Sequence, residues 1–393
     1  MPQDLTPEEQ LCLLLCRGRF SPDVAKRAVD QMQAGVHWDV LLERATTHGL
    51  IPLLYHRLRA LDFRGVPPSA RRNLADTFGV NAIRNMLLTE ELVRVLTQLG
   101  AAGVPVIPLK GIALAESLYG DAALRNSADL DILIHPKYLV DSLHLLESVG
   151  YRARWSDPSW VRLLARYGKD CLLMREDARR VYPLQVHCGL IWGGPAEQPL
   201  LAELWSDAAP RPFHAAPAYA LSPEWEFLYL AVHAARHGYP PYKWLVDLDW
   251  LLLRGGIDWD KVQEKAMRLG WKSVIKSCLA ACFSLLETPI PEPFGWIARH
   301  SPLESGTSGA KPLQIPRETI FALRLLPTYS QRFRFLATRL FVPTPADSGF
   351  LRLPSSLFFL YYFVRPWRLM VAVAGWFIQA GIARVRRLLR RGP

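Results

Sequence analysis

The sequence predicts an α+β protein in which a small sheet is embedded in helices. Two strand-like runs, residues 104–109 and 129–134, enclose a helical stretch at residues 112–119. Apolar residues at helical spacing precede this unit and return after it, in residues 140–149, 222–255 and 317–340. The chain has 393 residues, half of them hydrophobic, which is enough for several domains and a sizeable core.

The N-terminal third carries helix signals. Thr6 precedes Pro7 and two acidic residues, which is the usual layout of a helix start. His48 stands before Gly49, and we interpret this pair as a helix end with glycine in the left-handed cap rather than as a ligand. A long amphipathic helix is expected over residues 81–99, directly before the first strand.

Two carboxylates are predicted to share one face of the second strand. Residues two apart on a strand point the same way, so Asp129 and Asp131 lie together. Two like charges side by side favour a cation between them, and Mg²⁺ often uses one or two carboxylates plus substrate phosphates. The alternative is that Asp129 merely starts the strand while Asp131 lies at a solvated edge.

Basic residues flank this acidic pair. Lys110-Gly111 stands at a strand-to-helix junction, where free backbone N–H groups and a lysine can hold phosphate. Arg125 lies just before the acidic pair, where it can balance charge or bind an oxyanion. We therefore predict catalytic roles for Lys110, Arg125, Asp129 and Asp131.

A series of short segments carries a family resemblance: Leu109-Lys110-Gly111, Leu118-Tyr119-Gly120-Asp121, Leu124-Arg125 and Ser127 to Ile134, closing on Gly150-Tyr151. Together they resemble the uncharacterised bacterial nucleotidyltransferase family. That family belongs to the polymerase-β-like superfamily. The resemblance implies a mixed sheet flanked by helices, with the acidic pair binding Mg²⁺ and a nucleoside triphosphate. The superfamily usually has Gly-Ser after the first strand, whereas this chain has Lys110-Gly111, as related family members do. Within this block, Gly111 and Ser127 are predicted to contact the substrate.

A hairpin is predicted from residues 169–174 and 181–187, with its turn around residues 175–180. The resemblance implies a third carboxylate on such a later strand, in an acid-x-His motif, but this chain has Gln185-Val186-His187. An amide oxygen can bind a metal, yet it has no charge and is a poor base. Either Gln185 is the third metal ligand and catalysis is weakened, or another acid such as Asp170 supplies it. His187 is either a phosphate ligand or a satisfied buried histidine.

A polar cluster is predicted in the helical segment that follows. His233 and His237 have i,i+4 spacing, and Lys243 and Asp247 open the next helix. The order of a His-rich helix and a Trp-x-x-Asp helix also resembles the family. We expect these four residues to face the nucleotide; hydrogen bonding between helices and a zinc pair are the alternatives.

Charge and cysteine usage restrict the partners and the compartment. The net charge of +11 favours anionic partners, although much of the excess gathers near the C-terminus in Arg384, Arg386, Arg387, Arg390 and Arg391. The six cysteines include no CxxC pair, and the i,i+4 pairs Cys12/Cys16 and Cys278/Cys282 suit small buried helix residues. The N-terminus lacks a signal-peptide layout, so we expect a cytoplasmic protein.

The C-terminal tail predicts contact with a membrane surface. Residues 357–364 and 369–383 are mostly apolar, and Arg365-Pro366-Trp367-Arg368 separates them. Neither piece reaches the roughly 20 residues of a spanning helix, and Arg365, Arg368 and Pro366 argue against one continuous span. Apolar residues flanked by arginines fit a segment in the interface of an anionic membrane, on the inner face of the cell membrane. The alternative is a tail packed on the protein itself.

The predicted organisation is an N-terminal helical region (residues 1–99), a nucleotidyltransferase core (100–192), a helical domain with the His/Trp/Asp cluster (193–300), and a linker with a hydrophobic, Arg-rich tail (301–393). The predicted function is Mg²⁺-dependent transfer of a nucleoside monophosphate from a nucleoside triphosphate to an acceptor hydroxyl, with Mn²⁺ as a substitute. The alternative is a catalytically weakened protein that binds a nucleotide or a partner at the membrane surface. Nucleic acid is not the expected partner, because the basic tail suits a membrane surface at least as well.

Overall fold

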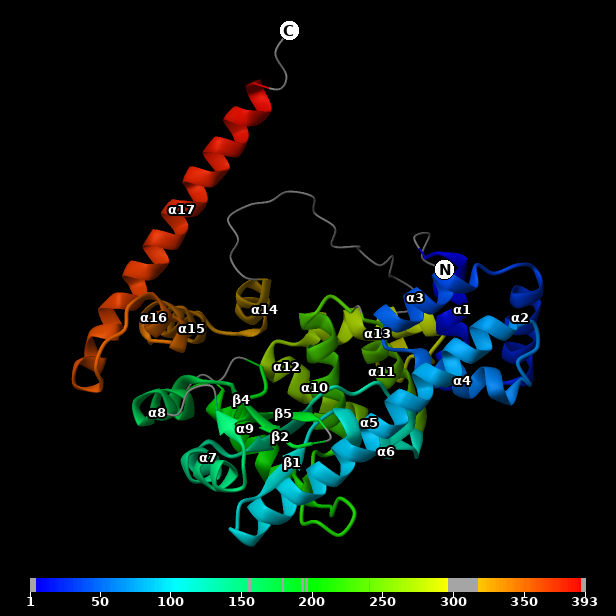
Figure 1. The fold of residues 1–393 in the computed structure, drawn as a ribbon, viewed down its shortest axis with the longest axis horizontal. Helices are drawn as coiled ribbons and strands as arrows, with labels where there is room; N and C mark the ends of the chain where they lie inside the picture. Colours follow the sequence, from blue (N-terminus) through cyan, green and yellow to red (C-terminus); the bar gives the residue numbers. More distant parts are fainter. Residues whose placement is uncertain are drawn as a thin grey trace.

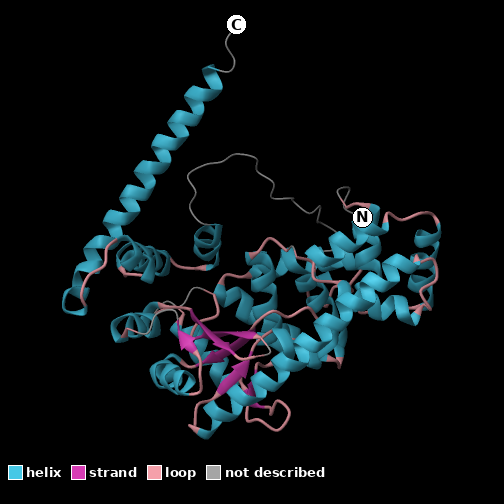
Figure 2. Cartoon of the chain, in the orientation of Figure 1, coloured by secondary structure: helices cyan, strands magenta, loops and turns pink. Residues whose placement is uncertain are grey.

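The computed structural model describes residues 5–153, 157–178, 180–191, 194, 197–239, 241–295 and 317–389. A five-stranded sheet lies among many helices (Figure 2). Its strand order is β1 (Val106–Pro108), β2 (Leu130–Ile134), β5 (Val181–His187), β4 (Asp170–Glu176) and β3 (Arg152–Ala153). The β2 and β5 strands are parallel and every other pairing is antiparallel. The predicted α+β class and mixed sheet are therefore confirmed, as is the hairpin.

The sheet separates two hydrophobic clusters. Leu130, Ile132 and Val186 belong to the cluster that also includes residues of α5 (Pro68–Ala101) and α7 (Leu139–Ser148). Leu133 belongs to a larger cluster with the N-terminal helices and the helices that follow the sheet. Because side chains alternate along a strand, Asp131 shares the face of Leu133. Asp131 therefore lies on the side of the larger cluster, whereas Asp129 lies in the bend just before β2.

The N-terminal region is helical, as its capping signals predict. It contains α1 (Pro7–Cys16), α2 (Pro22–Gln33), α3 (Trp38–Thr47) and α4 (Ile51–Ala60). Thr6 and Glu9 form a reciprocal capping box at α1. His48 ends α3, and Gly49 follows with φ of +69°, so the predicted glycine cap is confirmed.

Helix α5 is bound to the hairpin by a buried carboxylate. Glu91 accepts hydrogen bonds from Arg94, from Arg175 of β4 and from the hydroxyl of Tyr151. Burial alone would raise the pKa of Glu91, but these hydrogen bonds hold it below its usual value. The long helix therefore supports the far face of the sheet.

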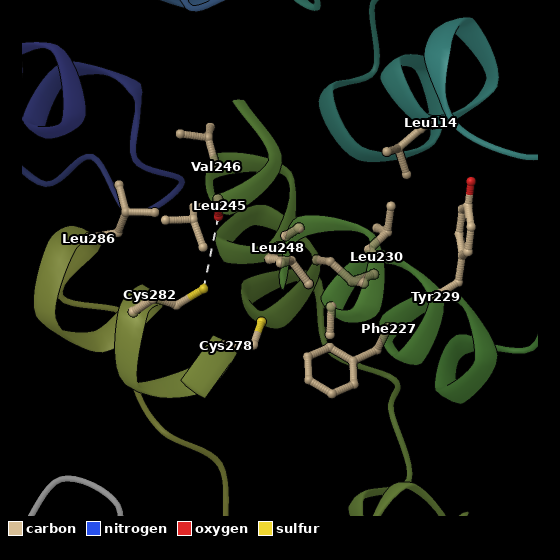
Figure 3. Packing of buried hydrophobic residues seen from close by; sticks show 14 of the residues in the cluster. Leu114, Phe227, Tyr229, Leu230, Leu245, Val246, Leu248, Cys278, Cys282 and Leu286 are labelled. Carbon is tan, nitrogen blue, oxygen red and sulfur yellow. Dashed lines mark hydrogen bonds between the residues drawn. The ribbon is translucent and has the colours of Figure 1, made fainter. Parts of the chain in front are cut away.

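Helices packed on one another form the larger cluster around the site. They include α6 (Gly111–Tyr119), α9 (Gln198–Asp207), α10 (Pro223–Arg236), α11 (Lys243–Arg254), α12 (Trp259–Leu269) and α13 (Lys272–Leu286). Figure 3 shows Leu114 of α6 beside Leu230 of α10, with Cys278 and Cys282 of α13 directed at α11. All six cysteines are buried and free, so the interpretation of the i,i+4 pairs as packing residues is confirmed. The small strands β6 (Ala209–Pro210) and β7 (Tyr219–Ala220) form a separate ribbon.

The C-terminal region ends in a long helix that leaves the body of the molecule (Figure 1). The C-terminal region comprises α14 (Arg317–Leu325), α15 (Tyr329–Phe341), α16 (Pro345–Phe350), the 3-10 helix η4 (Ser355–Leu360) and α17 (Tyr361–Leu389). Its neighbour in the core is α8 (Pro158–Tyr167). The predicted linker at residues 301–314, the boundary at Trp192, and Arg390 and Arg391 lie outside the described residues. For Arg384, Arg386 and Arg387 only the helical backbone is described.

The two apolar pieces of the tail are joined, because α17 runs through Pro366. Pro366 removes one backbone donor, but the neighbouring charges are paired rather than exposed. Arg365 donates to the carbonyl of Arg339 and to Thr344, and Arg368 donates to Asp347 of α16. A 21-residue segment, Ser355–Gly375, has a mean hydropathy of 1.3 and is 11% buried, so its length and composition suffice to cross a membrane. This segment joins the two apolar pieces, which corrects the expectation that Arg365, Pro366 and Arg368 argue against one continuous span.

Candidate functional site

The turn between β1 and α6 brings backbone amides next to the acidic pair. The N–H of Leu109 donates to the carbonyl of Asp131, and α6 begins at Gly111 with φ of +65°. A Cβ on Gly111 would lie 3.5 Å from the carbonyl oxygen of Asp129 and 4.0 Å from the Ser127 hydroxyl. Glycine is required here because positive φ is strained for other residues. The first turn of α6 has no side-chain cap, which is the arrangement that binds anions.

Asp131 is the most constrained residue of the site. It is 4% exposed, and its Oδ1 accepts from Lys110 Nζ at 2.9 Å and lies 2.8 Å from His187 Nε2. Burial alone would raise the pKa of Asp131, but the His187 hydrogen bond and the Lys110 charge hold it well below its usual range. Among the described residues, Asp131 Oδ2 and the Ser127 hydroxyl are buried without a hydrogen-bond partner.

Asp129 lies just before β2 and is half-buried. Burial, followed by the charge of Asp131, raises the pKa of Asp129. The negative charges of the two carboxylates therefore act on each other, and one oxygen of Asp131 has no hydrogen-bond partner among the described residues. This donor set fits Mg²⁺, which prefers oxygen ligands and is completed by phosphates and water.

Gln185 lies beside Asp131 in register on the parallel strand β5, so both residues share a face of the sheet. It stands where the resemblance implies a third carboxylate. The other candidate, Asp170, is paired across the hairpin with His187, and its Oδ2 lies 3.8 Å from His187 Nδ1 and 3.0 Å from Lys169 Nζ. Within the described ranges, no group of three or more acidic, His or Cys side chains is arranged to hold a metal.

Arg125 and Asp247 bind each other. Both are buried, and Arg125 Nε and Nη2 donate to the two carboxylate oxygens at 2.9–3.1 Å. The Tyr119 hydroxyl donates to the same carboxylate at 2.7 Å. Direct roles at the ligand were predicted for Arg125 and Asp247, but the structure pairs them, because a buried charge is costly without a partner. They connect the loop before β2 to α11.

Two asparagines that sequence reasoning missed orient this loop. Asn81 and Asn85 of α5 donate from their amides to the carbonyls of Ala123, Ala122 and Arg125. Both are buried. Their i,i+4 spacing on an otherwise apolar helix face was the available signal, since buried polar side chains need partners.

Lys243 is the second lysine near the site. Its Nζ donates to the carbonyl of Asn126 at 3.3 Å, and its stem packs against Gly49 of the N-terminal region. Burial, and then the charge of Arg125, lowers the pKa of Lys243 to about 8. A phosphate bound beside Lys243 would stabilise the charged form of this lysine.

His233 and His237 pack on an aromatic side chain. Their ring centroids lie 4.9 Å and 4.5 Å from that of Trp244 on α11. Burial, and then the Lys110 charge, lowers the pKa of His233 well below its usual value, so this ring is neutral. The effect of Lys110 also shows that His233 lies near the site. His237 is exposed. The shared contact with Trp244 supports packing between helices rather than a zinc pair.

Comparison with known proteins identifies the family. The sequence profile of the family described as "Uncharacterised nucleotidyltransferase" matches residues 34–287, more than half of the chain. This chain belongs to that nucleotidyltransferase family. A search of solved structures finds similarity to an antigenic nucleotidyltransferase-like protein from Paracoccidioides brasiliensis, with 15% identity, a TM-score of 0.35, and coverage of 52% of this chain and 93% of that one. No protein in the curated comparison matches.

The nucleotidyltransferase family region contains every residue of the site described above. It begins within the N-terminal helices and ends at α13, so α14 to α17 lie beyond the matched residues. The acidic pair and Gln185 therefore lie within the matched residues.

Proposed function

We propose that this protein transfers a nucleoside monophosphate from a nucleoside triphosphate to an acceptor hydroxyl, with Mg²⁺, or Mn²⁺ in its place, bound by Asp129 and Asp131. The observation that carries the proposal is the Asp131 carboxylate. Lys110 and His187 hold one of its oxygens, while the other is buried and unpaired among the described residues. When bound, the metal supplies positive charge that neutralises the triphosphate.

The chain's own residues position the triphosphate. The backbone N–H groups at the start of α6 and the Ser127 hydroxyl donate hydrogen bonds to phosphate oxygens. Lys110 and Lys243 add positive charge. The acceptor oxygen attacks the α-phosphorus, the bond to the β-phosphate oxygen breaks, and pyrophosphate leaves. The hydroxyl proton needs a base, and Asp170 beside His187 is the carboxylate that this site offers, since Gln185 cannot accept it.

The direct test is product formation. Purified protein is incubated with each α-³²P-labelled nucleoside triphosphate, MgCl₂ and an extract of the native cells. A labelled product that disappears with EDTA supports the proposal. If no nucleotide releases pyrophosphate even when the cell extract is present, the proposal is refuted.

A second candidate rests on Gln185 alone. With an amide in the third position, the protein would bind a nucleotide or a partner without transferring the nucleotide, at a membrane surface. Calorimetric binding of a nucleoside triphosphate without pyrophosphate release would favour this candidate over the enzyme.

We expect Gln185→Glu to tighten metal binding and to raise turnover. A charged oxygen in register with Asp131 binds Mg²⁺ better than an amide does, so the Mg²⁺ concentration for half-maximal activity should fall roughly tenfold. The paired variant Asp170→Asn should lower turnover without changing the metal requirement. A Gln185→Glu protein with lower turnover and an unchanged metal requirement would show that the new charge only crowds a complete site.

We expect nucleotide binding to weaken as the pH rises through 8. Arg125, Asp247, Asp129 and Lys110 surround Lys243, whose pKa of about 8 means that it is mostly charged at pH 7 and mostly neutral at pH 9. The bound triphosphate favours the charged lysine, so binding takes up protons near pH 8 and loses roughly tenfold in affinity between pH 7 and pH 9. Calorimetry in two buffers of different protonation enthalpy measures this uptake. Lys243→Met should abolish it, and equal uptake in both proteins would contradict the assignment.

A further inference from the structure

A cavity of about 760 Å³ lies between the core and the C-terminal helices, outside the nucleotide site. Residues of α8 and the start of β4 form one wall, and residues of α15 and of the turn before α16 form the other. Its inner end reaches Asp170, whose carboxylate lies 3.8 Å from His187, the residue hydrogen-bonded to Asp131. The cavity therefore adjoins the predicted position of the attacking group.

The walls of this cavity have two kinds of lining. Most of the lining is apolar, including Leu164, Leu172, Phe333 and Val342. Basic side chains also line it: Lys169, Arg236 and Arg334. An apolar chain that ends in an anionic polar head complements both kinds of lining.

The outer wall continues into an exposed apolar surface. Phe333 of α15 lines the cavity and is 73% exposed. Exposed large apolar side chains extend from it along α15, η4 and α17: Leu336, Leu340, Phe341, Leu357, Phe359, Phe363, Trp367 and Met370. Isolated exposed apolar residues are ordinary, but this many on three successive elements favours an interaction surface. The η4 and α17 residues of this list belong to the segment Ser355–Gly375, which is apolar enough to cross a bilayer and only 11% buried.

We propose that this cavity binds the acceptor, and that the acceptor is an amphiphilic lipid with an anionic head that carries a hydroxyl group. This proposal rests on the proposed nucleotidyltransferase function. The apolar surface of α15, η4 and α17 lies against the membrane, and the lipid chain lies along the apolar cavity wall. The head then extends to Asp170. Its hydroxyl oxygen forms a bond to the α-phosphorus, the bond to the β-phosphate oxygen breaks, pyrophosphate leaves, and Asp170 accepts the proton.

Binding of a fluorescent lysophosphatidylglycerol to the full chain tests the proposal without any transfer. We expect saturable binding below the critical micelle concentration, and affinity should rise about tenfold when the acyl chain grows by two methylene groups. Glycerol 3-phosphate, which is a head without a chain, should bind at least tenfold more weakly. A monoacylglycerol with the same label lacks the charge and should also bind more weakly.

A matched pair of variants locates the site. Ala337→Trp fills the cavity and should weaken lysophosphatidylglycerol binding at least tenfold. Ser330→Trp adds the same ring at an exposed position of α15 that belongs neither to the cavity lining nor to the apolar surface, and it should bind like the wild type. Equal affinity of both variants, or affinity that is independent of chain length, would overturn the proposal.

Two further measurements separate the two proposals and the two surfaces. Nucleotide binding is measured on the same samples, so its absence would refute the nucleotidyltransferase site while the lipid result stands alone. Flotation with vesicles of phosphatidylcholine and phosphatidylglycerol tests the apolar face, and Phe363→Glu with Trp367→Glu should reduce it. Retention of the wild type by duplex DNA, with no flotation on the vesicles, would assign the surface to nucleic acid and overturn the membrane route.

Discussion

Asp129→Asn is expected to abolish nucleotide transfer, by roughly 10³-fold or more, without destabilising the metal-free protein. Burial and the charge of Asp131 raise the pKa of Asp129, so its negative charge is unfavourable until a cation binds. Removing that charge should leave the free energy of unfolding unchanged or slightly higher. Turnover, calorimetric Mg²⁺ binding and urea unfolding measure the three quantities.

Asp131→Asn is expected to lose the same activity but to cost stability as well. Lys110 and His187 both bond to this carboxylate, and their unpaired buried groups should cost about 1–3 kcal/mol. The pKa of Asp131 is lower in the folded state, so its stabilisation is present above about pH 4 and is lost as the pH falls below that value. The stability difference from wild type should therefore shrink in acid.

The control for both variants is Asp141→Asn on α7, which removes one carboxylate from an exposed position. It should leave turnover and stability unchanged. A double Asp129→Asn/Asp131→Asn protein with wild-type turnover would eliminate the proposed enzyme, whatever its stability.

Arg125→Met is expected to destabilise the protein by about 3–5 kcal/mol, because it leaves the buried Asp247 carboxylate without its cation. Asp247→Asn removes the charge but keeps an oxygen that can accept from the Tyr119 hydroxyl. The double variant should therefore be less destabilised than the sum of the single variants, with a coupling of about 1–3 kcal/mol. Urea unfolding of the four proteins measures this cycle.

Activity adds a second readout for this pair. If Arg125 acts only through the loop that it holds, the double variant should retain nucleotide binding at a concentration of urea where it is folded. Additive destabilisation would show that the two side chains do not depend on each other. Loss of nucleotide binding in a folded double variant would restore a direct ligand role for Arg125.

The sequence by itself determined the features that depend on neighbouring residues. The alternating run predicted the strand that carries Asp131, and capping chemistry identified the helix start at Pro7. The hairpin that carries Gln185 and His187 was also predictable, because its two strands are close in the chain. These signals are short-range, and packing did not override them.

Only the tertiary structure decided which charges are partners. Arg125 and Asp247 are 122 residues apart, and no local pattern shows that burial pairs them instead of presenting them to a ligand. Asp347 likewise pairs with Arg368, 21 residues further along the chain, and joins α16 to α17. The physical reason is the same in both cases: a buried charge must find an opposite charge, and the fold alone determines which one is within reach.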